Sequence, residues 1–239
     1  MSDAMPQFTR AGFLLGVRLS LPILPGIAAF ALAYGTVAVQ KGLTLAEAAV
    51  MSALVYAGAS QLVGLEIWTT PLTPAAAVAV VGVVAAINLR LILMGAALRP
   101  WLGGVPARQV YPALGILTDA NWVIALRYRA EGGNDWAVLV GSGLVIWMVW
   151  AGAAIPGYLF GALVADPRRW GLDLMMPAFF VAMLVPLWRG PRRSLPWIVS
   201  GVVSLATAEL VAGYWFIVTG AVTGSLAGAI LGPRDGGDA

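Results

Sequence analysis

Long apolar runs dominate the chain, and short polar segments separate them. Seven runs have the length of a membrane-spanning helix, which takes about 17–25 residues. They are 12–40, 46–68, 74–98, 136–165, 171–188, 195–212 and 214–231. A weaker run, 110–126, contains several polar residues. The pattern predicts an all-α polytopic integral membrane protein, a helical bundle of seven spans, or of eight if the weaker run also crosses.

Composition supports a membrane environment. Of the 239 residues, 60% are hydrophobic and only 10% are charged, whereas soluble domains have about 45–50% and about 25%. We expect a single transmembrane transporter domain, 12–232, with short polar tails at 1–11 and 233–239. The first run lacks a cleavable-signal pattern, so we expect it to remain as a span, with a tilt or a break at its prolines. The predicted location is the cytoplasmic (inner) membrane, multi-pass.

The net charge is +3, and we interpret it as the usual surplus of arginine in cytoplasmic loops. The clustered basic face of a nucleic-acid-binding protein is absent. If the weaker run does not cross, the four arginines that flank it share a face with Lys41 and the C-terminal basic residues. These arginines are Arg99, Arg108, Arg127 and Arg129. This bias favours seven full spans, a broken or re-entrant element near Asp119, an outside N-terminus and a cytoplasmic C-terminus.

The two halves of the chain share a weak motif. Pro25-Gly26 and Gly42-Leu43-Thr44-Leu45 resemble Pro156-Gly157 and Gly171-Leu172-Asp173-Leu174. With seven spans, the repeated three-helix units have opposite orientations, as in many secondary transporters. Because such dipeptides are common in this composition, chance explains the internal repeat equally well.

The middle of the 46–68 run reads Tyr56-Ala57-Gly58-Ala59-Ser60-Gln61. On a continuous helix, Ser52, Tyr56 and Ser60 fall on one face. Small residues followed by an amide favour an unwound segment whose backbone faces a cavity. A small-residue packing interface is the alternative. A buried glutamine is costly without a partner, so we predict that Tyr56, Gly58, Ser60 and Gln61 bind substrate.

Asn88 and Arg90 lie deep in the 74–98 run, and Asp119 and Asn121 lie in the weaker run. An arginine at depth costs at least about 2.5–3.5 kcal/mol. Snorkelling to the headgroups is the alternative for Arg90, and a helix N-cap at a break is the alternative for Thr118-Asp119. We predict that Asn88, Arg90 and Asn121 bind substrate. Asp119 would balance Arg90, bind an ammonium group or carry the coupling proton.

Other features are weaker. Glu209 is a second candidate for proton coupling, because a carboxyl at depth is either protonated or paired. Arg18 is close enough to the N-terminal end to snorkel. Four glycines spaced by four residues predict a packing ridge: Gly220, Gly224, Gly228 and Gly232.

The chain has no histidine and no cysteine, which excludes the HExxH and Ser–His routes. An aspartyl mechanism would need Asp119 and Glu209 in contact. We therefore expect a protein that is not an enzyme and that has no cofactor or metal.

Four segments together resemble the AzlC family, the large subunit of two-component branched-chain amino acid exporters. They are Ser52–Gln61, Asn88-Leu89-Arg90, Leu117-Thr118-Asp119, and Leu172–Phe180 continuing to Leu184-Val185-Pro186. The resemblance covers nearly the whole chain, 12–232. It implies export of valine, leucine, isoleucine and sometimes methionine, with a separately encoded four-span partner of the AzlD type. In two places the chain departs from the family pattern, which often has His where Leu91 stands and an acidic residue where Ala120 stands.

These features lead to one hypothesis, a proton-coupled secondary transporter subunit that exports small apolar amino acids. Arg90 would hold the substrate carboxylate, and Asp119 with Ser60 and Gln61 would hold the ammonium group. The Val/Leu/Met-rich walls would hold the side chain. The alternatives are a membrane-embedded enzyme, a scaffold subunit that transports nothing without its partner, and an exporter of another small metabolite.

Overall fold

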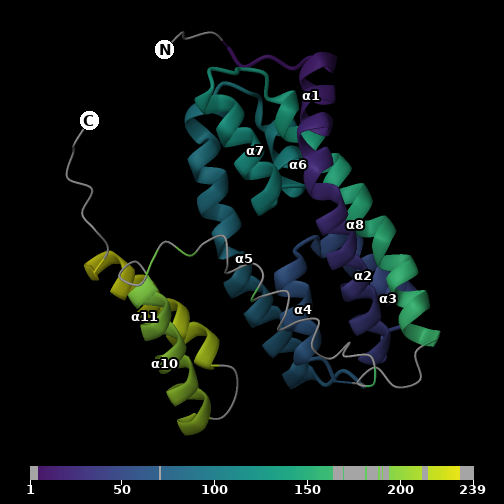
Figure 1. Ribbon diagram of the computed structural model, residues 1–239, viewed down its shortest axis with the longest axis vertical. Coiled ribbons are helices and arrows are strands. Elements are labelled where there is room, and N and C mark those ends of the chain that lie inside the picture. The colour runs from purple at the N-terminus through teal and green to yellow at the C-terminus, as the bar shows by residue number, and fades with distance from the viewer. Residues whose placement is uncertain are drawn as a thin grey trace. The chain divides into compact units, whose positions relative to one another are not determined.

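The structure is a computed structural model that describes residues 5–69, 71–163, 169, 181, 188, 190, 194–211 and 215–231. The chain divides into two compact units between Asp173 and Leu174, and we describe each by itself. Every named element in the described residues is a helix (Figure 1). The predicted all-α class is therefore confirmed.

Among the described residues, three helical elements are long and apolar enough to cross a membrane. The first joins α1 (Arg10–Ser20), a 3₁₀ turn (Leu21–Ile23) and α2 (Leu24–Gln40). The second is α5 (Pro74–Leu102) and the third is α8 (Ala137–Leu163). The 3₁₀ turn coincides with Pro22, because proline has no backbone donor and crowds the preceding helical turn. The first span therefore has a break.

The α1–α2 element packs beside α8 (Figure 1). Gly16 lies against the backbone of Val138, and Gly157 lies against the backbone of Leu32. Residue numbers at these contacts increase in the same direction along both elements, so the two elements run parallel. The glycines let their backbones touch. These are the helices that carry the two Pro-Gly motifs, so their predicted opposite orientation is wrong. The second half of that motif, 171–174, lies outside the described residues.

The 46–68 run does not form one helix. α3 (Leu45–Val55) enters the unit, the chain turns at Tyr56, and α4 (Gly58–Glu66) runs back. Glu66 pairs with Lys41 just before α3, at 3.1 Å, so the hairpin starts and ends at the same end of the unit. The 11 residues of α3 reach roughly 16 Å, about half of the roughly 30 Å hydrocarbon core. The full span predicted here is replaced by a re-entrant hairpin, which we call hairpin 1.

α6 (Ala107–Gly115) and α7 (Asp119–Ala130) form a second helical hairpin, hairpin 2. Leu114 lies 3.9 Å from the position of a Cβ on Gly95, so α6 runs back along α5. Trp122 donates a hydrogen bond to the Met94 carbonyl at 3.1 Å, and α7 then follows α5 outward. The break predicted near Asp119 is present, and the 110–126 run turns back on itself.

The two hairpins enter the first unit from opposite ends. Hairpin 2 ends beside the start of α1, where the Gln7 amide donates to the Asn134 carbonyl at 3.0 Å. We call this the Arg10 end, and the end where hairpin 1 starts the Lys41 end. The span α1–α2 followed by hairpin 1 is thus repeated upside down by α5 followed by hairpin 2, an inverted arrangement. The four arginines around hairpin 2 lie at the Arg10 end, so the prediction that they share a face with Lys41 is wrong.

The second unit contains α10 (Leu195–Leu210) and α11 (Trp215–Leu231), packed against each other. Gly220 lies against the Ser204 hydroxyl, and a Cβ on Gly224 would be 2.7 Å from the Ser200 Cβ. The Ser200 hydroxyl donates to the Gly220 carbonyl at 2.8 Å. The predicted glycine ridge is a packing face within this unit. Gly232 lies outside the described residues, as does the predicted 171–188 span apart from residues 181 and 188.

Candidate functional site

The tip of hairpin 1 is bonded both to α8 and to hairpin 2. Tyr56 has a left-handed backbone (φ 42°, ψ 44°), which is uncommon for a residue other than glycine. Its hydroxyl donates to the Gly143 carbonyl in α8 at 3.3 Å and contacts the Thr118 side chain of hairpin 2. The two hairpins therefore meet end to end in the interior of the first unit.

Asn121 fixes the tip of hairpin 2. Its side-chain oxygen accepts hydrogen bonds from the Thr118 amide (2.7 Å) and hydroxyl (3.1 Å). Its nitrogen donates to the carbonyls of Ile116 (3.1 Å) and Leu139 (3.4 Å). These four bonds use the whole capacity of an amide, so Asn121 caps α7. The substrate-binding role of Asn121 stays a prediction.

Gly143 of α8 allows hairpin 2 to approach. A Cβ atom at this position would lie 2.6 Å from Asn121 Nδ2 and 2.9 Å from the Ile116 carbonyl oxygen, which is closer than normal contacts allow. Sequence analysis missed this residue. The available signal was the small triplet Gly141-Ser142-Gly143 within an apolar run.

Gly58 has a similar packing role at the tip of hairpin 1. A Cβ atom there would lie 2.6 Å from the Trp150 ring and 2.8 Å from the Phe30 ring. Trp150 also packs against Phe30 and Tyr34, with ring centroids 5.1 and 5.9 Å apart. These rings form an apolar wall beside hairpin 1 that sequence analysis did not identify. The substrate-binding role of Gly58 stays a prediction.

α5 joins the two hairpins through two of its side chains. Asn88 donates to the Ser60 hydroxyl in α4 at 3.1 Å. Arg90 Nη2 lies 2.9 Å from Asp119 Oδ2 in the first turn of α7. Arg90 stands roughly 24 Å from the start of α5 and roughly 18 Å from its end, so the ion pair is at mid-depth. α5 therefore links three motifs that are far apart in the sequence, with Asn88 and Arg90 pointing to different sides of the helix.

Stability alone does not account for the Arg90–Asp119 pair. The two side chains are 38% and 51% exposed on the first unit, and pairs with such exposure contribute only about 0–1 kcal/mol. Charges at the middle of a span are costly and usually functional. The start of α7 favours the Asp119 carboxylate, because the helix dipole is positive there. The pair is thus held in place, and part of each side chain is left uncovered by the described residues.

Several buried polar atoms of hairpin 1 and α5 lack partners. Gln61 is fully buried, and its amide nitrogen donates to the Met51 carbonyl at 2.8 Å. Within the described part of the chain, no hydrogen bond reaches Gln61 Oε1, Asn88 Oδ1, Arg90 Nε or Ser52 Oγ. An unsatisfied buried polar group costs about 1–3 kcal/mol. Gln61 and Asn88 contribute acceptors, Arg90 contributes a donor, and the Ser52 hydroxyl can donate or accept.

Comparison with known proteins decides the family. The family model described as AzlC protein matches residues 22–164, a range that includes both hairpins, α5 and α8. The chain belongs to the AzlC family. The inner membrane protein YgaZ of Escherichia coli (strain K12) is 27% identical over 234 residues, covering 92% of this chain and 91% of YgaZ. No solved structure matches.

Membership of the AzlC family confirms the resemblance seen in four sequence segments. Three of those segments carry the residues that α5 joins: Ser60 to Asn88, and Asp119 to Arg90. The family, the inner-membrane relative and the apolar helices agree on a membrane protein with a transport-related role. The fourth segment, 172–186, lies outside the described residues except for residue 181.

Two predictions about this AzlC-family site need comment. Ser52, Tyr56 and Ser60 do not share a helix face, because the chain reverses at Tyr56 and places Ser52 and Ser60 on different helices. That prediction is wrong. Glu209 lies exposed in α10 of the second unit. Its role in proton coupling and its pairing with Asp119 stay predictions.

Proposed function

We propose that this chain is the large subunit of an exporter that exchanges valine, leucine or isoleucine for protons across the cytoplasmic membrane. The observation that carries the proposal is the Arg90–Asp119 pair at 2.9 Å between the tips of two opposed hairpins. A zwitterion carries the same two charges as the pair. It can therefore take the place of each partner: Arg90 binds its carboxylate and Asp119 its ammonium group. The net charge inside the span does not change, which avoids burying a new charge.

Groups of hairpin 1 and of the helices beside it suit the rest of such a substrate. The unpartnered oxygens of Gln61 and Asn88 are acceptors for an ammonium N–H. The aromatic wall of Trp150 and Phe30 provides apolar surface for an aliphatic side chain. A few placed polar groups within an apolar lining are typical of small-molecule sites.

Coupling follows from competition at Asp119. Its carboxylate binds either a proton or the substrate ammonium, but not both at once. Substrate and proton therefore alternate on the site, and proton entry drives substrate exit. If protonation of Asp119 instead freed Arg90 for the carboxylate, proton and substrate would bind together, and the gradient would drive uptake. The sign of the pH dependence separates these two schemes.

We infer from the charges of the first unit that its Arg10 end is cytoplasmic. Five arginines lie at this end: Arg10, Arg99, Arg108, Arg127 and Arg129. At the other end, Lys41 pairs with Glu66. Cytoplasmic loops carry the excess of Lys and Arg, so the N-terminus is cytoplasmic in this proposal. That orientation replaces the outside N-terminus expected from the sequence.

The test uses proteoliposomes that contain this chain, with or without a small four-span subunit of the AzlD type, and measures labelled valine counterflow. We expect transport with both subunits, competition by leucine and isoleucine, and no competition by lysine or glutamate. Arg90→Gln should abolish counterflow, whereas Arg18→Gln, on the exposed side of α1, should not. Normal counterflow by Arg90→Gln would favour the scaffold alternative and contradict the proposal.

A further inference from the structure

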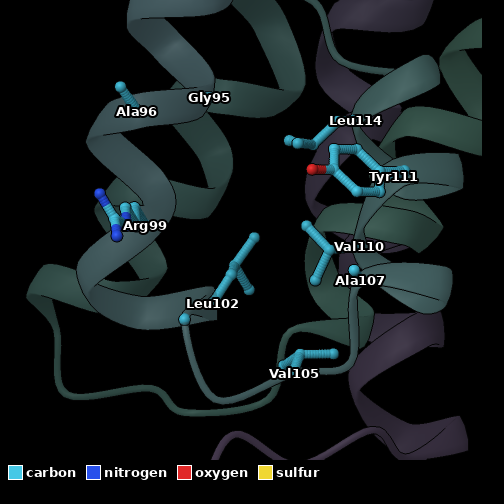
Figure 2. A pocket seen from close by; sticks show the side chains of 10 residues that line it. Gly95, Ala96, Arg99, Leu102, Val105, Ala107, Val110, Tyr111 and Leu114 are labelled. Atoms are coloured by element: carbon cyan, nitrogen blue, oxygen red, sulfur yellow. The ribbon is translucent and has the colours of Figure 1, made fainter.

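A groove separate from the ion pair lies between the end of α5 and hairpin 2. Its volume is about 310 Å³. Small residues of α5 and α6 leave the space, and larger apolar side chains line it. The lining consists of Gly95, Ala96, Arg99, Leu102, Gly103, Val105, Ala107, Val110, Tyr111 and Leu114. Figure 2 shows Leu102 and Val110 between the two helices and the Tyr111 hydroxyl directed toward α5, with the Arg99 guanidinium on the side of α5 away from α6.

The groove has a surplus of positive charge. Among the described residues, Arg99 has no ion-pair partner. The described acids of this half of the unit are engaged elsewhere: Glu131 pairs with Arg127 at 3.0 Å, and Asp119 pairs with Arg90. Asp135 accepts hydrogen bonds from Thr9. A ligand that completes the charge balance at Arg99 is therefore anionic.

The groove is also amphipathic, with polar and apolar residues of the kinds that occur at a membrane interface. Arg99 stands in the last turn of α5, and Tyr111 is 72% exposed. Arginine and tyrosine gather where headgroups meet hydrocarbon, and basic pockets between transmembrane helices bind anionic headgroups. Leu102, Val110 and Leu114 continue the groove as apolar surface. The fitting ligand has a negative head and an aliphatic tail.

We propose that this groove binds an anionic phospholipid from the leaflet at the Arg10 end. In this proposal the long Arg99 side chain turns its guanidinium to the phosphate, the Tyr111 hydroxyl lies at the edge of the same groove, and an acyl chain lies along Leu102, Val110 and Leu114. α5 carries Arg90, and α6 is the first helix of hairpin 2. A lipid seated between them links hairpin 2 to the helix that carries the ion pair, and so stabilises the first unit.

The experiment uses the full chain in a neutral detergent and adds phosphatidylglycerol, phosphatidylcholine or inorganic phosphate. We expect phosphatidylglycerol to raise the Tm by about 3 °C or more, and the other two to raise it less. Native mass spectrometry should show retained phosphatidylglycerol. Arg99→Gln should lose both effects. Arg10→Gln removes the same charge from the same end, outside the groove, and should keep them.

A second variant covers the case in which Arg99→Gln does not fold. Val110→Trp leaves the charge unchanged and fills the groove, so it should release the lipid. Three results would overturn the proposal: Arg99→Gln or Val110→Trp retaining phosphatidylglycerol like the parent chain, an equal shift with inorganic phosphate, or no selectivity in the parent. The last result is expected if another segment of the chain occupies the groove.

Discussion

The Arg90 guanidinium lies 2.9 Å from the Asp119 carboxylate, between two hairpins that enter from opposite ends. Hairpin 1 stands between this pair and the Lys41 end, and hairpin 2 stands between it and the Arg10 end. The Tyr56 hydroxyl ties the two tips together through Gly143 and Thr118. Separation of one tip from this junction would open the pair toward one end at a time, as alternating access requires.

Tyr56→Phe should loosen the junction of the two tips. It removes the hydrogen bond from the Tyr56 hydroxyl to the Gly143 carbonyl, worth about 0.5–1.5 kcal/mol. About 1 kcal/mol shifts an equilibrium roughly fivefold. We therefore expect Ala59→Cys, beside the tip, to react about fivefold faster with a hydrophilic thiol reagent in the Tyr56→Phe background.

Tyr158→Phe is the matched control for this prediction. The Tyr158 hydroxyl also donates to a backbone carbonyl, that of Leu43 at 2.8 Å, but away from the tips. It should lower the Tm by a similar amount and leave the labelling rate at residue 59 unchanged. Equal labelling rates in both variants would show that Tyr56 does not hold the tips together.

Gly143→Ala should displace hairpin 2. The added methyl group would lie 2.6 Å from Asn121 Nδ2, and overpacking of this kind costs about 1–3 kcal/mol. A shift of about 1 Å in a site costs roughly a hundredfold in rate, so valine transport should fall well beyond the loss of stability. Thermal unfolding and initial transport rates on the same preparation measure both effects.

Gly152→Ala, in the same helix, provides the comparison. A Cβ there meets nothing within 4 Å, and alanine is favoured over glycine in a helix by about 0.5–1 kcal/mol. This variant should be as stable as the parent or more stable, with normal transport. If the two variants have the same stability and the same transport rate, the close approach of hairpin 2 to Gly143 is not needed for transport.

Residue chemistry predicted the pairing of Arg90 with Asp119 better than it predicted the path of the chain. Arg90 and Asp119 were identifiable because charges at depth need partners, and the breaks near Tyr56 and Thr118 followed from small and capping residues. The reversal at Tyr56 was not identifiable. A run of 46–68 has the length and apolarity of a span whether it continues or folds back, since both forms bury apolar side chains.

The errors in topology follow from that one reversal. Because hairpin 1 returns to its own side, Lys41 lies opposite Arg99 instead of beside it. The inverted arrangement also relates different elements from those suggested by the Pro-Gly motifs. Gly143 was missed because its role is to let hairpin 2 come close to the backbone of α8. No polar or charged residue in the sequence signals such a contact.

Cysteine accessibility tests the two hairpins directly, because the chain has no cysteine of its own. Ala46→Cys and Thr69→Cys flank hairpin 1, and Gln109→Cys and Ala130→Cys lie near the ends of hairpin 2; all four positions are exposed. A membrane-impermeant thiol reagent on intact cells should label the first pair and not the second. If residues 46 and 69 react from opposite sides, hairpin 1 is a full span after all.

The central claim, that substrate and proton compete for Asp119, is tested most directly by valine affinity as a function of pH. In the parent complex, we expect the affinity to weaken as the pH falls, because a protonated Asp119 no longer attracts the ammonium group. Asp119→Asn should bind about tenfold more weakly, a loss of about 1.4 kcal/mol, and its affinity should not change with pH. Glu131→Gln, which neutralises an exposed acid paired with Arg127, should behave like the parent. Unchanged pH dependence and normal affinity in Asp119→Asn would contradict the account.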